Sequence, residues 1–169
     1  MDVTKIGVIG AGQMGNGIAH VMALAGYHVC LNDISEDVLS QALTRIDKNM
    51  MRQVKSGKIA QADKAAALAR ITTTLSIADI GQSDLVIEAA TEDEPTKQVI
   101  FDALVPHIQD HTILTSNTSS ISITRLASRT GRPEKFMGFH FMNPVPVMQL
   151  VELIRGIATD KETYDTCRA

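Results

Sequence analysis

Apolar residues along this chain follow two different spacings in turn. Short apolar runs, typical of strands buried in a sheet, alternate with longer stretches in which apolar residues recur every three or four positions, as in amphipathic helices. The runs predict strands at residues 5–10, 29–33, 71–74, 85–90, 112–116, 136–140 and 150–154. The helical spacing predicts helices after Gly15 and at residues 35–56, 61–69, 96–105, 123–128 and 161–167. Strands that alternate with helices predict an α/β fold with a doubly wound, mostly parallel sheet.

Residues 35–70 predict a helical hairpin that protrudes from this sheet. Its first helix is unusually long for a connection between strands, and Gly57 is expected to end it. The hairpin carries a basic stripe that consists of Lys48, Arg52, Lys55 and Lys58. Such a stripe is more often a solvated helix face, and a binding role is the alternative.

Three glycines with the spacing G-x-G-x-x-G follow the first predicted strand, at Gly10, Gly12 and Gly15. Gly10 allows a tight turn, Gly12 lets the backbone approach a pyrophosphate, and Gly15 lets the next helix pack closely on the sheet. The N-terminal N–H groups of that helix then point at the phosphates. Between a strand and a helix, this motif predicts a Rossmann-like dinucleotide-binding site, and a purely structural glycine turn is the alternative.

Asp33 ends the second predicted strand and bears on which dinucleotide is bound. A carboxylate at this place accepts hydrogen bonds from ribose hydroxyls and repels a 2′-phosphate. No arginine follows at residues 34–37 to receive such a phosphate, so NAD is favoured over NADP. The alternative interpretation is that Asp33 caps the helix that begins near Ser35.

The overall composition is that of one ordinary globular domain. The 169 residues are 44% hydrophobic and 21% charged, and 16 basic against 19 acidic residues give a net charge of -3 without long blocks of one sign. Nothing here indicates binding to nucleic acid or to a membrane, so a small-molecule partner is expected. With no leader and no apolar stretch of ~18 residues, we expect a cytoplasmic protein. Cys30 and Cys167 lack metal-ligand spacing, so no metal is expected.

Three polar residues near strand ends are candidates for catalysis. His140 ends a predicted strand at the carboxyl edge of the sheet, where its imidazole can exchange a proton with a substrate hydroxyl. Glu152 interrupts an apolar strand, so we expect it to be buried and to pair with His140. Ser119 follows another strand on the same edge and can hydrogen-bond the reacting oxygen. Taken singly, each has a structural alternative: a core histidine, an exposed strand glutamate and a helix-capping serine.

Several longer segments are more specific than the glycine motif. They are Gly7-Val-Ile-Gly-Ala-Gly-Gln-Met-Gly15, Val86-Ile-Glu-Ala-Ala90, Ser116-Asn-Thr-Ser-Ser120, and Gly138-Phe-His-Phe-Met-Asn-Pro-Val-Pro-Val-Met148 followed by Leu150-Val-Glu-Leu153. With them the chain resembles, from about residue 5 to its end, the nucleotide-binding domain of the L-3-hydroxyacyl-CoA dehydrogenases, most closely the short-chain 3-hydroxybutyryl-CoA dehydrogenases. The resemblance implies reversible, NAD-dependent oxidation of a short-chain L-3-hydroxyacyl-CoA, such as 3-hydroxybutyryl-CoA, to the 3-ketoacyl-CoA.

The resemblance also implies roles for individual residues. His140 resembles the family's general base, Glu152 the carboxylate paired with it, and Ser119 a hydroxyl near the substrate oxygen. Asn143 is implied near the nicotinamide amide and the substrate. The family places its helical hairpin over the coenzyme A tail, which makes the lysines of the hairpin candidates for binding its phosphates. The implied cofactor contacts are Gly10, Gly12, Gln13, Met14, Gly15, Asp33, Glu92, Lys97, Asn117, Ser119 and Asn143, and the lysines are Lys55 and Lys58.

Members of this family carry a second, all-helical domain that forms a homodimer and adds an asparagine to the active site. We therefore expect residues 1–158 to form the NAD-binding domain and residues 159–169 to begin a truncated helical domain, with residues 160–169 either loosely held or bound by a neighbouring molecule. Such a chain alone is expected to bind NAD and turn over acyl-CoA poorly, and the full-length protein to be a homodimer. Two alternatives stay open: an L-gulonate 3-dehydrogenase-like enzyme with the same His–Glu pair, and a non-catalytic NAD-binding module.

Overall fold

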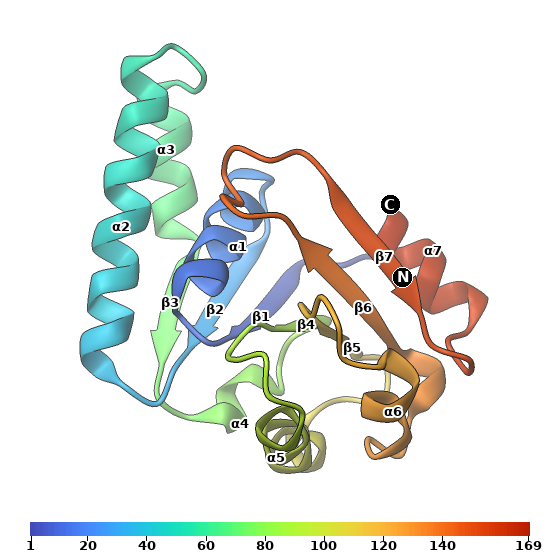
Figure 1. The fold of residues 1–169 in the computed structure, drawn as a ribbon. Helices are drawn as coiled ribbons and strands as arrows, with labels where there is room; N and C mark the ends of the chain where they lie inside the picture. Colours follow the sequence, from blue (N-terminus) through green and yellow to red (C-terminus); the bar gives the residue numbers. More distant parts are fainter.

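A seven-stranded sheet forms the centre of the structure, a computed structural model that describes residues 1–169 (Figure 1). Its strand order is β3-β2-β1-β4-β5-β6-β7, with β7 antiparallel to β6 and all other neighbours parallel. The chain order reverses beside β1, so the carboxyl ends of β1 and β4 border the crevice where such sheets bind ligands. The strands are β1 (Lys5–Ile9), β2 (His28–Asn32), β3 (Ile71–Thr74), β4 (Leu85–Glu88), β5 (Ile113–Ser116), β6 (Phe136–Phe141) and β7 (Val151–Arg155).

Helices cover both faces of this sheet, which confirms the predicted doubly wound fold (Figure 1). Side chains of the first three helices meet one face, and side chains of the next three meet the other. The last helix packs against β6 and β7. The helices are α1 (Gln13–Leu24), α2 (Glu36–Lys55), α3 (Gln61–Ala69), α4 (Ile77–Ile80), α5 (Glu94–Leu104), α6 (Ile123–Ser128) and α7 (Lys161–Arg168).

Two apolar cores hold the layers together. On the α1 side, Ile6 and Val8 of β1 pack with Ile18 of α1 and with buried residues of α2. On the other side, side chains from β4, β5 and β6 pack with α5 and α6, and the rings of Phe101 and Phe136 meet edge to face with centroids 5.0 Å apart. Because both faces of the central strands are buried, β4 and β5 are apolar on both sides.

The predicted hairpin of α2 and α3 protrudes at one end of the sheet (Figure 1). The buried residues of α2 recur at helical spacing, and the helix therefore turns one apolar face toward α1 and α3. Its polar side bears the basic stripe. Gly57, with a φ of 73°, follows the end of α2 as predicted.

Several element boundaries differ from the predicted ones. β1 ends at Ile9 because Gly10 adopts a φ of 93°, which is outside the strand region. α5 begins at Glu94 rather than at residue 96, since Asp93 caps it and a proline occupies its first turn. The helix α4 was not predicted, because four residues are too few to show a helical period.

The expectation that residues 160–169 are loosely held is wrong for this structure. Asp160 caps α7 by accepting a hydrogen bond from Thr163 N at 2.7 Å, and its own N–H donates to Glu134 O at 3.0 Å. The guanidinium of Arg155 lies 5.6 Å from the centroid of the Tyr164 ring. These contacts fix α7 to the sheet edge. None of the helices combines the length and the apolar composition that crossing a membrane requires.

Candidate active site

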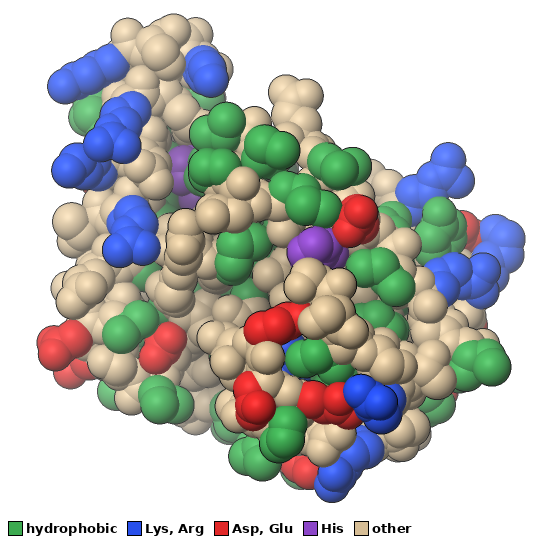
Figure 2. Space-filling model, viewed as in Figure 1, with side chains coloured by type: hydrophobic (Ala, Val, Ile, Leu, Met, Phe, Trp, Pro, Cys, Tyr) green, Lys and Arg blue, Asp and Glu red, His purple; other side chains and the backbone are tan.

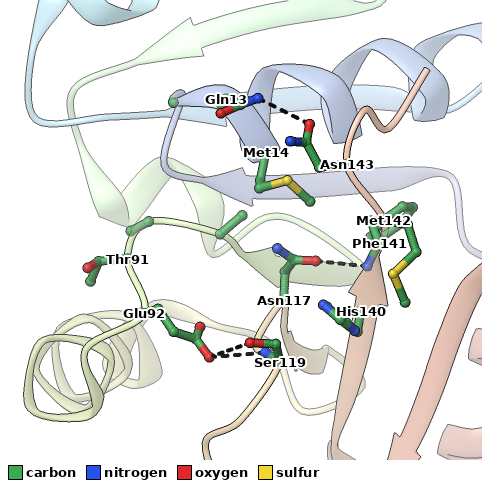
Figure 3. Close-up of a pocket in the computed structure, with 13 residues that line it drawn as sticks. Gln13, Met14, Thr91, Glu92, Asn117, Ser119, His140, Phe141, Met142 and Asn143 are labelled. Atoms are coloured by element: carbon green, nitrogen blue, oxygen red, sulfur yellow. Dashed lines mark hydrogen bonds between the residues drawn. The ribbon is translucent and has the colours of Figure 1, made fainter. Parts of the chain in front are cut away.

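A cleft of about 370 Å³ opens at the carboxyl ends of the central strands (Figure 3). Its walls come from the glycine turn after β1 and from the segments that follow β4, β5 and β6. Loops that follow strands on this edge are the usual place for ligand sites in open α/β sheets. The lining residues are Gly12, Gln13, Met14, Ala89, Ala90, Thr91, Glu92, Asn117, Ser119, His140, Phe141, Met142 and Asn143.

The three motif glycines are needed for different reasons. A Cβ on Gly10 would lie 2.5 Å from Ala90 Cα, and one on Gly15 would lie 1.6 Å from the Gly10 carbonyl oxygen. A Cβ on Gly12 would meet nothing within 4 Å, so the backbone there faces open space. Helix α1 begins at this point without a side-chain cap and without an acidic residue in its first turn. This surface suits the pyrophosphate of a dinucleotide.

Asp33 joins the glycine turn to the end of β2. Its carboxylate accepts hydrogen bonds from Ala11 N at 2.8 Å and Ser35 N at 3.1 Å. The N-cap residue of α2 is Ser35, whose hydroxyl accepts from Val38 N, and Asp33 assists the start of this helix through its contact with Ser35 N. A second cavity of about 530 Å³ adjoins Asp33 and is lined mainly by apolar side chains. An adenine ring beside Asp33 would fit this apolar surface.

His140 and Glu152 form a close pair, and His140 lines the cleft on the side away from the glycine turn. They are direct cross-strand partners in the antiparallel β6–β7 ladder, and His140 Nδ1 lies 2.8 Å from Glu152 Oε2. The predicted pairing is therefore present. The predicted burial of Glu152 is wrong, since its side chain is 51% exposed whereas that of His140 is 18% exposed. Glu152 projects from β7, the edge strand of the sheet, in which no residue is fully buried, and this position explains its exposure.

Glu92 organises the segment that carries Ser119. Its Oε1 accepts hydrogen bonds from Ser119 N at 3.0 Å and from the Ser119 hydroxyl (Figure 3). It also accepts from Thr118 Oγ1 at 2.6 Å, from Ser120 N at 3.2 Å and from the Ser120 hydroxyl. Partial burial raises the pKa of Glu92, but these hydrogen bonds outweigh it and the net pKa is lowered. A stable carboxylate at this place fixes the Ser119 hydroxyl beside His140.

The polar side chains at the mouth of the cleft are linked across it. Gln13 Nε2 donates to Asn143 Oδ1 at 3.1 Å, and Asn117 Oδ1 accepts from Phe141 N at 2.8 Å (Figure 3). Met14 lines the cleft between these two contacts. The structure thus brings the predicted site residues to one edge of the sheet: the glycine turn, Gln13, Met14, Asp33, Glu92, Asn117, Ser119, His140, Asn143 and Glu152.

Lys97 does not reach this cleft. Its side chain is 0% exposed, and its Nζ lies 2.5 Å from Glu88 Oε2. Glu88 also accepts hydrogen bonds from Ala90 N at 2.8 Å and from Ser116 Oγ at 2.7 Å. Sequence reasoning gave Glu88 no role, although a glutamate inside an apolar strand was a usable signal for a buried, paired carboxylate.

Lys55 and Lys58 also lie apart from the cleft, near the tip of the hairpin, and both are exposed. Figure 2 shows lysine and arginine side chains gathered along the hairpin. A shallow polar groove on α2 contains Arg45, Lys48 and Arg52 but neither of these two lysines. The structure therefore leaves the basic hairpin as a separate surface.

Comparisons with known proteins agree with this geometry. The family model described as "3-hydroxyacyl-CoA dehydrogenase, NAD binding domain" matches residues 5–169. A 3-hydroxybutyryl-CoA dehydrogenase of Bradyrhizobium diazoefficiens is 53% identical, over 98% of this chain and 57% of that protein. The crystal structure of an (S)-3-hydroxybutyryl-CoA dehydrogenase from Ralstonia eutropha superposes with a TM-score of 0.94 at 44% identity, over 97% of this chain and 58% of that one.

A third match has the same character. The crystal structure of a 3-hydroxybutyryl-CoA dehydrogenase from Escherichia coli gives a TM-score of 0.96 at 40% identity, over 99% of this chain and 35% of that one. The chain spans a little over half the length of the curated relatives that it matches.

Proposed function

We propose that this chain, which belongs to the 3-hydroxyacyl-CoA dehydrogenase family, supplies the NAD site and the general base for reversible oxidation of an L-3-hydroxyacyl-CoA to the 3-ketoacyl-CoA. The observation that carries the proposal is the contact of His140 with Glu152, 2.8 Å long, in the same cleft as the glycine turn. The names of the similar proteins favour a short acyl chain, such as 3-hydroxybutyryl.

In this proposal His140 accepts the proton of the substrate hydroxyl. Glu152 contacts Nδ1, so that Nδ1 carries the ring proton and Nε2 keeps the free lone pair that a general base needs. When bound, NAD accepts the hydride that leaves C3 of the substrate. Glu152 stabilises the imidazolium that His140 becomes. The single hydroxyl proton of Ser119, which points to Glu92 in this structure, would turn to the reacting oxygen and donate a hydrogen bond to it.

The cofactor is proposed to lie along the edge from Asp33 to Asn143. The N-terminus of α1 binds the pyrophosphate, and Asp33 accepts hydrogen bonds from the adenosine ribose and disfavours a 2′-phosphate. Glu92, Asn117 and Asn143 surround the nicotinamide end, as do Gln13 and Met14. A direct contact of Lys97 with the cofactor would require its Nζ to leave Glu88, so Lys97 is proposed to support the floor of the cleft instead.

The coenzyme A tail is proposed to lie toward the basic hairpin, where exposed Lys55 and Lys58 can bind its phosphates. The resemblance to dimeric dehydrogenases supports the further proposal that the natural protein is a homodimer. Lys55→Ala and Lys58→Ala should raise KM for acyl-CoA and leave kcat nearly unchanged. Lys161→Ala, at an exposed lysine outside the hairpin, is the matched control.

An NADH absorbance assay with acetoacetyl-CoA tests the function directly. We expect the full-length protein to turn over acetoacetyl-CoA with NADH and this chain alone to do so poorly, with neither oxidation of L-gulonate with NAD nor reduction of free acetoacetate by either. Oxidation of L-gulonate without turnover of acetoacetyl-CoA would favour a gulonate dehydrogenase. Binding of NADH by the full-length protein without turnover of any of the three would favour a non-catalytic NAD-binding module.

A further inference from the structure

Gly17 stands in the interior of α1, where a glycine is unexpected. It is a poor helix former, and nothing about a regular helix requires it. Its φ is not in the left-handed region, and it lies outside the G-x-G-x-x-G motif. A glycine at such a place indicates that something else occupies the volume of a side chain.

The loop between β6 and β7 occupies this volume. A Cβ on Gly17 would lie 2.8 Å from Val145 Cβ and 3.1 Å from Val145 Cγ2, and 3.5 Å from Pro146 Cδ. Val145 is only 5% exposed and packs in the core beside α1. Because the nearest atom is a Cβ and not the far end of a flexible side chain, an added methyl group would displace the loop backbone.

The same loop carries Asn143 into the wall of the cleft, two residues before Val145 (Figure 3). Helix α1 thus contacts the loop at two points one turn apart. Gln13 Nε2 donates to Asn143 Oδ1 at 3.1 Å, and Val145 packs against Gly17. The turn is also braced internally, since Val147 N and Met148 N both donate to Pro144 O at 3.0 Å. A push on Val145 would therefore shift Asn143 with it.

We propose that Gly17 is a positioning residue. Its lack of a side chain lets Val145 pack against α1, and this contact holds Asn143 where it can face the nicotinamide end of the cofactor. This inference rests on the proposed function only in taking NAD as the ligand of the cleft. It gives Gly17 no contact with substrate or cofactor. Its effect on binding passes through Asn143, at the far end of the cleft from Asp33.

Gly17→Ala separates this role from a general packing role. NADH and ADP-ribose share the ribose and pyrophosphate contacts, but only NADH carries the nicotinamide. We expect the Kd for NADH to rise about tenfold, the equivalent of one lost hydrogen bond, and the Kd for ADP-ribose to stay nearly constant. Gly156→Ala is the matched control, because the same methyl group there would meet atoms only at 3.4 Å or more.

A double-mutant cycle identifies the contact responsible. Val145→Gly removes both atoms of Val145 that the new methyl group would meet, so Gly17→Ala should have little further effect on NADH affinity in that background. Equal losses of affinity for NADH and ADP-ribose on Gly17→Ala would overturn the proposal. So would an equal effect of Gly17→Ala on NADH affinity in the unmodified chain and in Val145→Gly. If Gly17→Ala does not fold, the single variant Val145→Gly decides the question. A loss of affinity for NADH but not for ADP-ribose supports the positioning role, and an unchanged ratio of the two Kd values overturns it. Neither ligand assay needs turnover, so a failure of the proposed reaction would leave this test intact.

Discussion

Glu88→Gln tests whether the ion pair beneath the cleft stabilises the fold. Glu88 and Lys97 are both fully buried, and the pair joins β4 to α5 with 2.5 Å between Lys97 Nζ and Glu88 Oε2. Glutamine has nearly the same shape as glutamate, removes the charge and replaces one of the two acceptor oxygens by an NH2 group. Lys97 is then left as a buried ammonium group with no counter-charge.

The structure sets the size of the expected effect. Removal of one partner from a buried ion pair costs about 3–5 kcal/mol, because the remaining charge stays desolvated and unpaired. We expect at least about 3 kcal/mol for Glu88→Gln, because glutamine has one acceptor oxygen where Glu88 uses two: Oε1 accepts from Ala90 N, and Oε2 accepts from Lys97 and Ser116. Glu88→Gln with Lys97→Met should cost less than the sum of the single changes, because no charge is then left unpaired.

Urea unfolding followed by circular dichroism measures this cost, with an unchanged m-value as the check that compactness is preserved. Asp102→Asn is the control: Asp102 lies 3.5 Å from Arg129, and the two side chains are 49% and 54% exposed, so loss of this pair should cost about 0–1 kcal/mol. A Glu88→Gln variant no less stable than Asp102→Asn would refute the reasoning.

Two further predictions concern other carboxylates. Partial burial raises the pKa of Asp84, but hydrogen bonds from Lys5 N and Thr4 N, and from the side chains of His111 and Thr4, outweigh it and lower the pKa to about 2. A depressed carboxylate pKa stabilises the fold above its usual value of 3.8, so Asp84→Asn should lower the free energy of unfolding by about 2 kcal/mol at pH 7 and by much less at pH 2, as urea titrations at both pH values would show. Asp33→Ala should weaken NADH binding by about 1–2 kcal/mol in fluorescence titrations, and NADPH affinity equal to NADH affinity in the unmodified protein would contradict the assigned role.

The parts of the site that sequence could predict are local. Gly10, Gly12 and Gly15 stand between a strand and a helix, so their geometry follows from the motif itself. The pairing of His140 with Glu152 was also predictable, because both interrupt apolar strands. The chain folds back between them through residues 142–150, which are too few for the crossover that a parallel pair needs.

Contacts between distant residues account for what was missed. Lys97 lies on a helix where a lysine is ordinarily exposed, and its burial depends on Glu88 from a neighbouring strand. Gly17 and Val145 are far apart in sequence, and neither reveals the other. The exposure of Glu152 depends on β7 being the edge strand, which the strand order decides.

The central claim is that His140, oriented by Glu152, is the general base. It is tested most directly in the full-length protein, by kcat of His140→Gln for oxidation of 3-hydroxybutyryl-CoA, with NADH affinity measured on the same variant. A general base contributes ~10²–10⁴-fold, so we expect kcat to fall by at least a hundredfold with NADH affinity nearly unchanged, and Glu152→Gln to add little to that loss. His107→Gln, at an exposed histidine, is the control and should keep full activity. An equal loss in the control, or a His140→Gln variant that keeps most of its kcat, would contradict the account.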